Sequence, residues 1–149
     1  MNQIVDSQIT SEQLLHKIIN GKWEEVLNYL CRINDNIVII NHKIFKHFAT
    51  NETYPIISNY VINHLDNILT KHNSFRVYIN MKELTMRDID KHKKYIIDVS
   101  KFLQEKYPNK LEKCDIINAP SIFKCLYNIV SILLDSDTKK KIEILYTQK

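Results

Sequence analysis

The stretch that decides the fold covers residues 106–145 and reads KYPNKLEKCDIINAPSIFKCLYNIVSILLDSDTKKKIEIL. It holds two short apolar runs, 114–117 and 142–145. Both predict β-strands, and the first is apolar enough to be buried on both faces, as in a parallel sheet. The first strand should end before Pro120, because proline has no backbone N–H to donate to a neighbouring strand.

Between these runs lies the segment 121–134, for which we predict a helix with Ser121 as its N-cap, followed by a polar turn over 135–140. Its only charge is Lys124, and its apolar side chains would point to every side instead of forming one stripe. Two interpretations stay open. The helix is either buried by its neighbours, or its outer face contacts a lipid chain or a membrane surface.

Several pieces of this stretch form a specific pattern: Tyr107-Pro108, Ile116-Ile117-Asn118-Ala119-Pro120, Phe123, Leu134-Asp135, Thr138 and Lys141-Ile142. With them the chain resembles the C-terminal half of the CRAL-TRIO lipid-binding domain, in a truncated and divergent form. The resemblance is coarse over 36–145 and clear over 75–145. It implies an α/β layered fold, with a mostly parallel sheet, flanking helices and a lipid pocket under a mobile gate helix that matches 121–134.

The resemblance also implies a function, which is non-catalytic binding of a phospholipid or another hydrophobic ligand, with lipid transfer or phosphoinositide sensing as the finer role. Family members that handle phosphoinositides contact the inositol phosphate through a lysine before the last strand, and Lys141 matches it. Asn109 stands where those members carry a glutamate. The candidate ligand-binding residues are Val77, Ile79, Ile116, Phe123, Leu126, Tyr127, Val130, Lys141 and Ile144.

Family domains usually follow a larger helical domain and continue past the last strand, and neither piece is recognisable in this sequence. That leaves open whether the pocket is open, smaller or filled. The alternative function is therefore a pocketless protein-interaction module that uses the apolar helix 121–134, including in a homodimer. Peripheral membrane contact is a further expected interaction.

The rest of the chain alternates between helix and strand patterns. Residues 1–9 resemble a loose tail, and Thr10 and Gln13 form a capping box that starts a helix. We predict helices over 10–19, 23–30, 54–69 and 89–106, the last capped by Asp88, and strands over 37–45 and 75–79. This order predicts an α/β sheet with right-handed crossovers. Residues 1–33 would form an N-terminal helical segment, and 34–149 a single compact domain.

Composition narrows the class of protein. With 149 residues, 44% hydrophobic and 26% charged, the chain predicts one soluble globular domain. The net charge of +4 favours anionic partners, but no nucleic-acid motif is present and we expect no nucleic-acid partner. The basic patch 91–94 should be a solvated face. Frequent Ile, Asn and Lys indicate an AT-rich genome, such as that of a large DNA virus or a protist.

Cysteine usage and the absence of sorting signals predict a cytoplasmic protein, or one of the host cytoplasm if the source is viral. Cys31, Cys114 and Cys125 show no paired spacing, so we expect reduced thiols buried in the core. The start of the chain has no secretory signal pattern, and no apolar stretch is long enough to span a bilayer.

Enzyme chemistry finds no support in the motifs. A single glycine excludes glycine-rich phosphate loops, and the histidines lack metal-ligand spacing. No serine lies in a nucleophile elbow. We therefore predict a protein that is not an enzyme and that needs neither metal nor cofactor.

Overall fold

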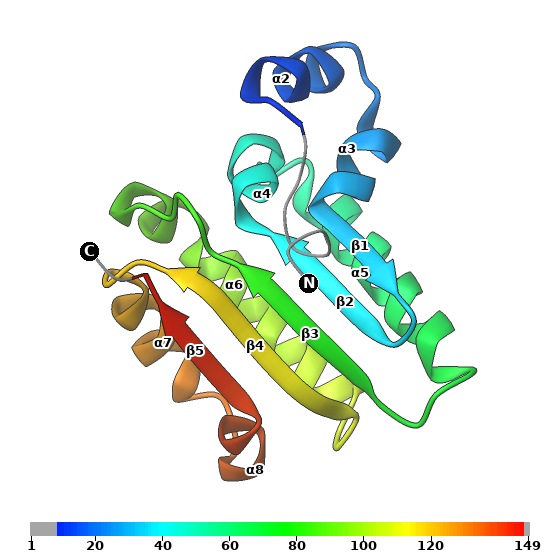
Figure 1. Ribbon diagram of the computed structural model, residues 1–149, viewed down its shortest axis with the longest axis vertical. Helices are drawn as coiled ribbons and strands as arrows, with labels where there is room; N and C mark the ends of the chain where they lie inside the picture. Colours follow the sequence, from blue (N-terminus) through cyan, green and yellow to red (C-terminus); the bar gives the residue numbers. More distant parts are fainter. Residues whose placement is uncertain (1–8, 148–149) are drawn as a thin grey trace.

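The computed structural model describes residues 9–147, which form a five-stranded sheet with helices packed along it (Figure 1). The elements in chain order are α2 (Ser11–Ile19), α3 (Trp23–Leu30), β1 (Cys31–Asn34), β2 (Ile37–Asn41), α4 (His42–Phe48), α5 (Tyr54–Leu69), β3 (Phe75–Asn80), α6 (Met86–Lys106), β4 (Leu111–Ala119), α7 (Phe123–Ser131), α8 (Ser136–Lys140) and β5 (Ile142–Tyr146). The predicted loose tail lies outside the described residues except for Ile9, which is buried.

The sheet has the strand order β1-β2-β3-β4-β5, in which β1 is antiparallel to β2 and the other three pairs are parallel. Each parallel connection moves one strand in the same direction, so right-handed crossovers put the connecting helices on one face of the sheet. Figure 1 shows α5 and α6 behind the sheet. The predicted α/β fold with a mostly parallel sheet is confirmed.

The strand predicted over 37–45 is wrong beyond Asn41. The Asn41 side chain accepts a hydrogen bond of 3.1 Å from the backbone N–H of Lys43, which caps a helix. Ile44 and Phe48 are then buried one helical turn apart. Strand β1 was not predicted; it pairs with β2 through a tight turn in which Asp35 takes a positive φ of 59°.

Two predicted helix starts also need correction. Helix α6 begins at Met86 with Thr85 as its N-cap, and Asp88 is the fourth residue of that capping box. Helix α7 begins at Phe123, and its N-cap is Ile122, without a side-chain cap, instead of Ser121. It ends at Ser131, three residues earlier than predicted. By contrast, the Thr10 capping box and the bounds of α3 and α5 are confirmed.

The buried side chains form two clusters. The larger one joins the N-terminal helices to the sheet, since Leu14 and Leu30 pack in the same cluster as Val38 and Phe48. The smaller one lies around β4 and α7, and its buried members are Leu84, Ile89, Cys114, Ile116, Ala119, Phe123 and Leu126. Val77 and Leu111 contact both clusters, and this is where the chain leaves a cavity.

Two expectations about single residues are wrong. Cys125 is exposed on α7, whereas Cys31 and Cys114 are buried as expected. Burial raises the pKa of each of these two thiols to about 12. In the basic patch 91–94, His92 is not solvated, because it points into the core and is only 1% exposed.

Candidate ligand-binding cavity

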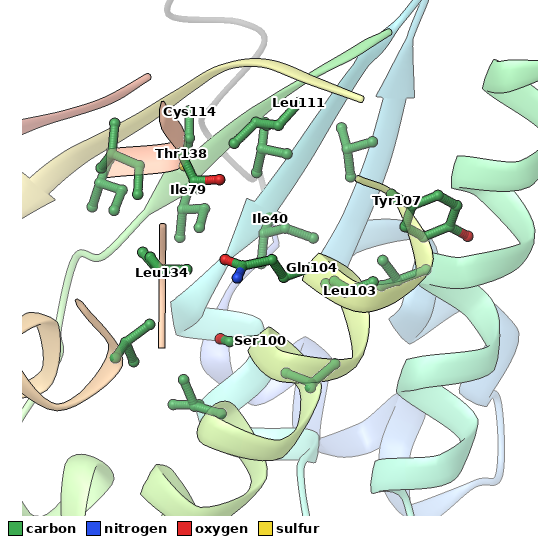
Figure 2. Close-up of a pocket in the computed structure, with 18 of the residues that line it drawn as sticks. Ile40, Ile79, Ser100, Leu103, Gln104, Tyr107, Leu111, Cys114, Leu134 and Thr138 are labelled. Carbon is green, nitrogen blue, oxygen red and sulfur yellow. The ribbon is translucent and has the colours of Figure 1, made fainter. Parts of the chain in front are cut away.

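A cavity of about 600 Å³ lies between the helix-covered face of the sheet and the helices. Strand pairing places Val38, Val77 and Cys114 side by side. Two residues further along β3 and β4, Ile79 lies next to Ile116. Side chains two residues apart on a strand share a face, so these rows form one continuous apolar floor. Figure 2 shows Ile40, Ile79 and Cys114 of this floor opposite α6.

Three helices form the walls because their apolar residues repeat at helical spacing. Helix α5 contributes residues at four-residue steps, and α6 contributes residues at three- and four-residue steps. The lining residues are Ile57, Val61 and Leu65 from α5, Ile96, Val99 and Leu103 from α6, and Phe123, Leu126, Tyr127 and Val130 from α7. The helices were recognisable in the sequence, but the lining role of α5 was not predicted.

Helix α7 is not a central helix buried on all sides. Phe123 and Leu126 are buried against the cavity, whereas Lys124, Cys125 and Asn128 are exposed on the other side. The pattern appeared apolar all round because the predicted segment included residues after the helix. One of these, Ile132, is 82% exposed. Helix α7 is thus an outer wall of the cavity.

The structure brings together all but one of the predicted ligand-binding residues. Those that line the cavity are Val77, Ile79, Ile116, Phe123, Leu126, Tyr127, Val130 and Lys141. Ile144 pairs with Ile116 in the sheet but does not line the cavity; it packs against the smaller cluster instead. Asn109 also lines the cavity.

The exposed lining residues mark the mouth of the cavity. They lie at the C-terminal end of α6 and at the start of α8: Glu105, Pro108, Asn109, Asp135 and Asp137. The Asp135 carboxylate caps α8 by accepting a 2.7 Å hydrogen bond from the backbone N–H of Thr138, which lowers the pKa of Asp135. Lys141 lies half-buried near these carboxylates along the lining.

Inside the mouth, Gln104 projects from α6 toward Leu134, with Ser100 one turn earlier on the same helix (Figure 2). The Gln104 Nε2 donates a 3.0 Å hydrogen bond to the Leu133 carbonyl oxygen. Its Oε1 is buried and has no hydrogen-bond partner among residues 9–147. Gln104 was not predicted as a site residue, because in the sequence it is indistinguishable from a polar residue on a helix surface.

A network of charged residues borders the other end of the cavity. His42 lines the cavity, and its Nε2 lies 3.2 Å from the Asp88 Oδ2, which also lies 3.1 Å from the Lys46 Nζ. Burial would raise the pKa of Asp88, but hydrogen bonds from Thr85, Lys46 and His42 outweigh it and lower the pKa to about 2. Burial lowers the pKa of His42. This network ties α4 to the start of α6.

The cavity offers little for catalysis. Cys114 is the one cysteine in the lining, and its pKa of about 12 keeps the thiol protonated and therefore poorly nucleophilic. Within the described range, no three His, Cys, Asp or Glu side chains are placed to hold a metal ion. What the arrangement provides is an apolar chamber with a polar mouth.

Comparison with known proteins assigns the family. The chain matches the model of the CRAL/TRIO domain over residues 36–149, and it belongs to that family. Its structure is similar to the crystal structure of Sfh5, with a TM-score of 0.62 and 18% sequence identity, over 89% of this chain and 57% of that chain. The chain thus spans little more than half the length of Sfh5. The resemblance seen in the sequence is confirmed.

Membership of the CRAL/TRIO family indicates binding of a lipid or another hydrophobic ligand. Over residues 9–147, none of the helices combines the length and the apolar character needed to cross a bilayer.

Proposed function

We propose that this protein binds one lipid or similar hydrophobic molecule in the cavity and carries it without changing it chemically. The observation that carries the proposal is the cavity of about 600 Å³, lined by apolar side chains from the sheet and from α5, α6 and α7. Pockets for small organic ligands usually measure about 300 to 1,000 Å³. A ligand of one or two alkyl chains fits this range.

The energetics favour a long apolar chain with a polar end. Apolar surface removed from water contributes about 25 cal/mol per Å². The apolar walls would take the chain, while the polar head stays near the exposed residues at the mouth, where water still solvates it. A polar group carried deeper would lose its hydration without compensation.

The surroundings of the mouth support exchange of the ligand at a membrane. The loop after α7 contacts α6 through the bond between Leu133 and Gln104, and this loop carries the 82% exposed Ile132. Phe102, two residues before Gln104, is 47% exposed. Exposed apolar side chains next to a lipid entrance favour contact with a bilayer surface. An Ile132→Ser variant should slow ligand transfer between vesicles; an unchanged rate would argue against this docking site.

The alternative function, a pocketless interaction module, predicts a filled core and a dimer. The cavity favours ligand binding over this alternative. The oligomeric state of the ligand-free protein, measured by light scattering after size-exclusion chromatography, tests the alternative separately. A dimer that forms only without ligand and buries α7 would favour it.

The test of the proposal is binding of diphenylhexatriene, an uncharged probe that fluoresces in apolar surroundings. Val130 lines the cavity from α7, whereas Asn128 is exposed on the same helix and does not line it. We expect Val130→Trp to fill part of the cavity and weaken probe binding at least about ten-fold, and Asn128→Trp to leave it unchanged. Equal binding by both folded variants would contradict the proposal.

A further inference from the structure

Ser100 places a hydroxyl group on the apolar side of α6. It lines the cavity, as do Ile96, four residues earlier, and Leu103, three residues later. Because residues three and four apart share one face of a helix, Ser100 lies in the middle of the lining stripe. Figure 2 shows its oxygen on the side of α6 from which Gln104 projects. The apolar wall therefore carries a hydroxyl at this point.

This hydroxyl has no partner within the described chain. Among residues 9–147, the Ser100 Oγ makes no hydrogen bond, including the bond to the carbonyl oxygen four residues earlier that helical serines often form. Ser58 also lines the cavity, but its Oγ lies 2.7 Å from the Tyr95 hydroxyl oxygen. A molecule the size of water can reach the Ser100 Oγ, whereas the Gln104 Oε1 is closed to it. Ser100 thus offers both a donor and an acceptor to a molecule in the cavity.

Ser100 lies deeper than the residues of the mouth. Glu105 is the first mouth residue along α6, and it follows Ser100 by a little more than one helical turn. At about 1.5 Å per residue, the two are about 7 Å apart along the helix axis. An extended chain covers about 1.2 Å per bond, so at least about six bonds separate a head group at the mouth from a group beside Ser100.

The surroundings of Ser100 favour a polar group without charge. Along the apolar walls, a polar group of the ligand loses its hydration without compensation. A hydroxyl or carbonyl group beside Ser100 would instead exchange its bond to water for a bond to the serine hydroxyl. An ion would need an opposite charge, but the acidic side chains of the lining lie at the mouth, with Lys141 near them: Glu105, Asp135 and Asp137.

From these observations we infer that the ligand is a lipid whose chain carries an uncharged hydroxyl or carbonyl group, at least about six bonds from the head group, and that Ser100 binds this group. An oxygenated fatty chain has this chemistry. The inference rests on the proposed function and makes the ligand class specific.

The experiment measures displacement of diphenylhexatriene from the wild-type protein by three uncharged esters. They are methyl stearate, methyl 10-hydroxystearate (the inner-hydroxyl ester) and methyl 2-hydroxystearate (the outer-hydroxyl ester). The two hydroxy esters have the same composition, but only the inner hydroxyl reaches the depth of Ser100. We expect the inner-hydroxyl ester to bind at least as tightly as the outer-hydroxyl ester. Without a partner it would bind about five-fold more weakly or worse, since burying an unpaired hydroxyl costs about 1 to 3 kcal/mol.

Variants then assign the effect to one residue. Ser100→Ala removes only the hydroxyl, so it should weaken binding of the inner-hydroxyl ester at least about five-fold and leave the other two esters unchanged. The matched control is Ser131→Ala, at the end of α7. Ser131 does not line the cavity, and its Oγ donates a 3.1 Å hydrogen bond to the Asn128 carbonyl oxygen. This variant should bind all three esters as the wild type does.

The outcomes separate this inference from the function on which it rests. If diphenylhexatriene does not bind to the wild-type protein, both are overturned. If it binds but no ester displaces it, or the inner-hydroxyl ester binds more weakly than the outer-hydroxyl ester, only the inference is overturned. Equal binding of the inner-hydroxyl ester by the wild type and Ser100→Ala would also refute the role of Ser100. The wild-type comparison needs no variant, so it stands even if Ser100→Ala fails to fold.

Discussion

Lowering the pH from 7 to 5 should destabilise this protein through one buried histidine. His92 is 1% exposed, its Nδ1 lies 2.6 Å from the Tyr54 hydroxyl oxygen, and its ring packs edge-on against Phe45. Burial, helped by the positive charge of Lys91 and opposed by Asp88, lowers the pKa of His92 to about 4. The folded protein therefore keeps this imidazole neutral at a pH where a solvated histidine is charged.

The sign of the effect follows from proton linkage. Below an unfolded-state pKa of about 6.5, the unfolded chain binds a proton that the folded chain does not bind until about pH 4. Stability is thus fully present above pH 6.5 and is lost as the pH falls toward 4. Between pH 7 and 5 the loss is about 2 kcal/mol. His42, whose pKa burial also lowers, acts in the same direction.

The assay is urea denaturation at pH 7 and at pH 5, read by circular dichroism. His92→Gln removes the titrating group, so the difference in unfolding free energy between the two pH values should shrink by about 2 kcal/mol. His16→Gln, at an exposed position of α2, is the control and should keep the wild-type difference. An identical pH dependence in wild-type and His92→Gln protein would refute the reasoning.

Three further predictions concern the core, a helix cap and the thiols. Ile44→Ala, at a fully buried site outside the cavity lining, should lower the unfolding free energy by about 2 to 5 kcal/mol; a loss under about 1 kcal/mol would contradict the burial. Thr85→Ala should lower it by about 0.5 to 2 kcal/mol through loss of the α6 cap, measured in the same titration. Cys125 alone should react with Ellman's reagent in the folded protein, while Cys31 and Cys114 should react only after unfolding; three fast thiols would refute this.

Most of the fold could be predicted from local sequence signals. The bounds of α5 follow from a long apolar period that starts beside a proline, and the Thr10 box marks the start of α2. The misses have local causes too. The apolar run after Ile37 fits a strand and a helix equally well, and only the Asn41 cap separates them. Strand β1 has the sequence CRIN, in which Ile33 is the only strongly apolar residue after Cys31. Its sequence therefore shows no alternation of apolar and polar residues from which a strand could be predicted.

The candidate site was predicted less completely. The resemblance located α7 and three floor residues, Val77, Ile79 and Ile116. The other floor residues, Val38, Ile40 and Cys114, were not predicted to line a pocket. The contribution of α5 could not be predicted, since an apolar helix stripe looks the same whether it borders a filled core or a cavity. Gln104 could not be found either, because its role depends on a contact with Leu133, which is distant in the sequence.

The most direct test of the central claim is native mass spectrometry of the freshly purified protein, followed by solvent extraction and identification of any bound molecule. We expect one bound hydrophobic ligand per chain. A chain that is ligand-free and binds no diphenylhexatriene, especially one that forms a dimer, would contradict the proposed function.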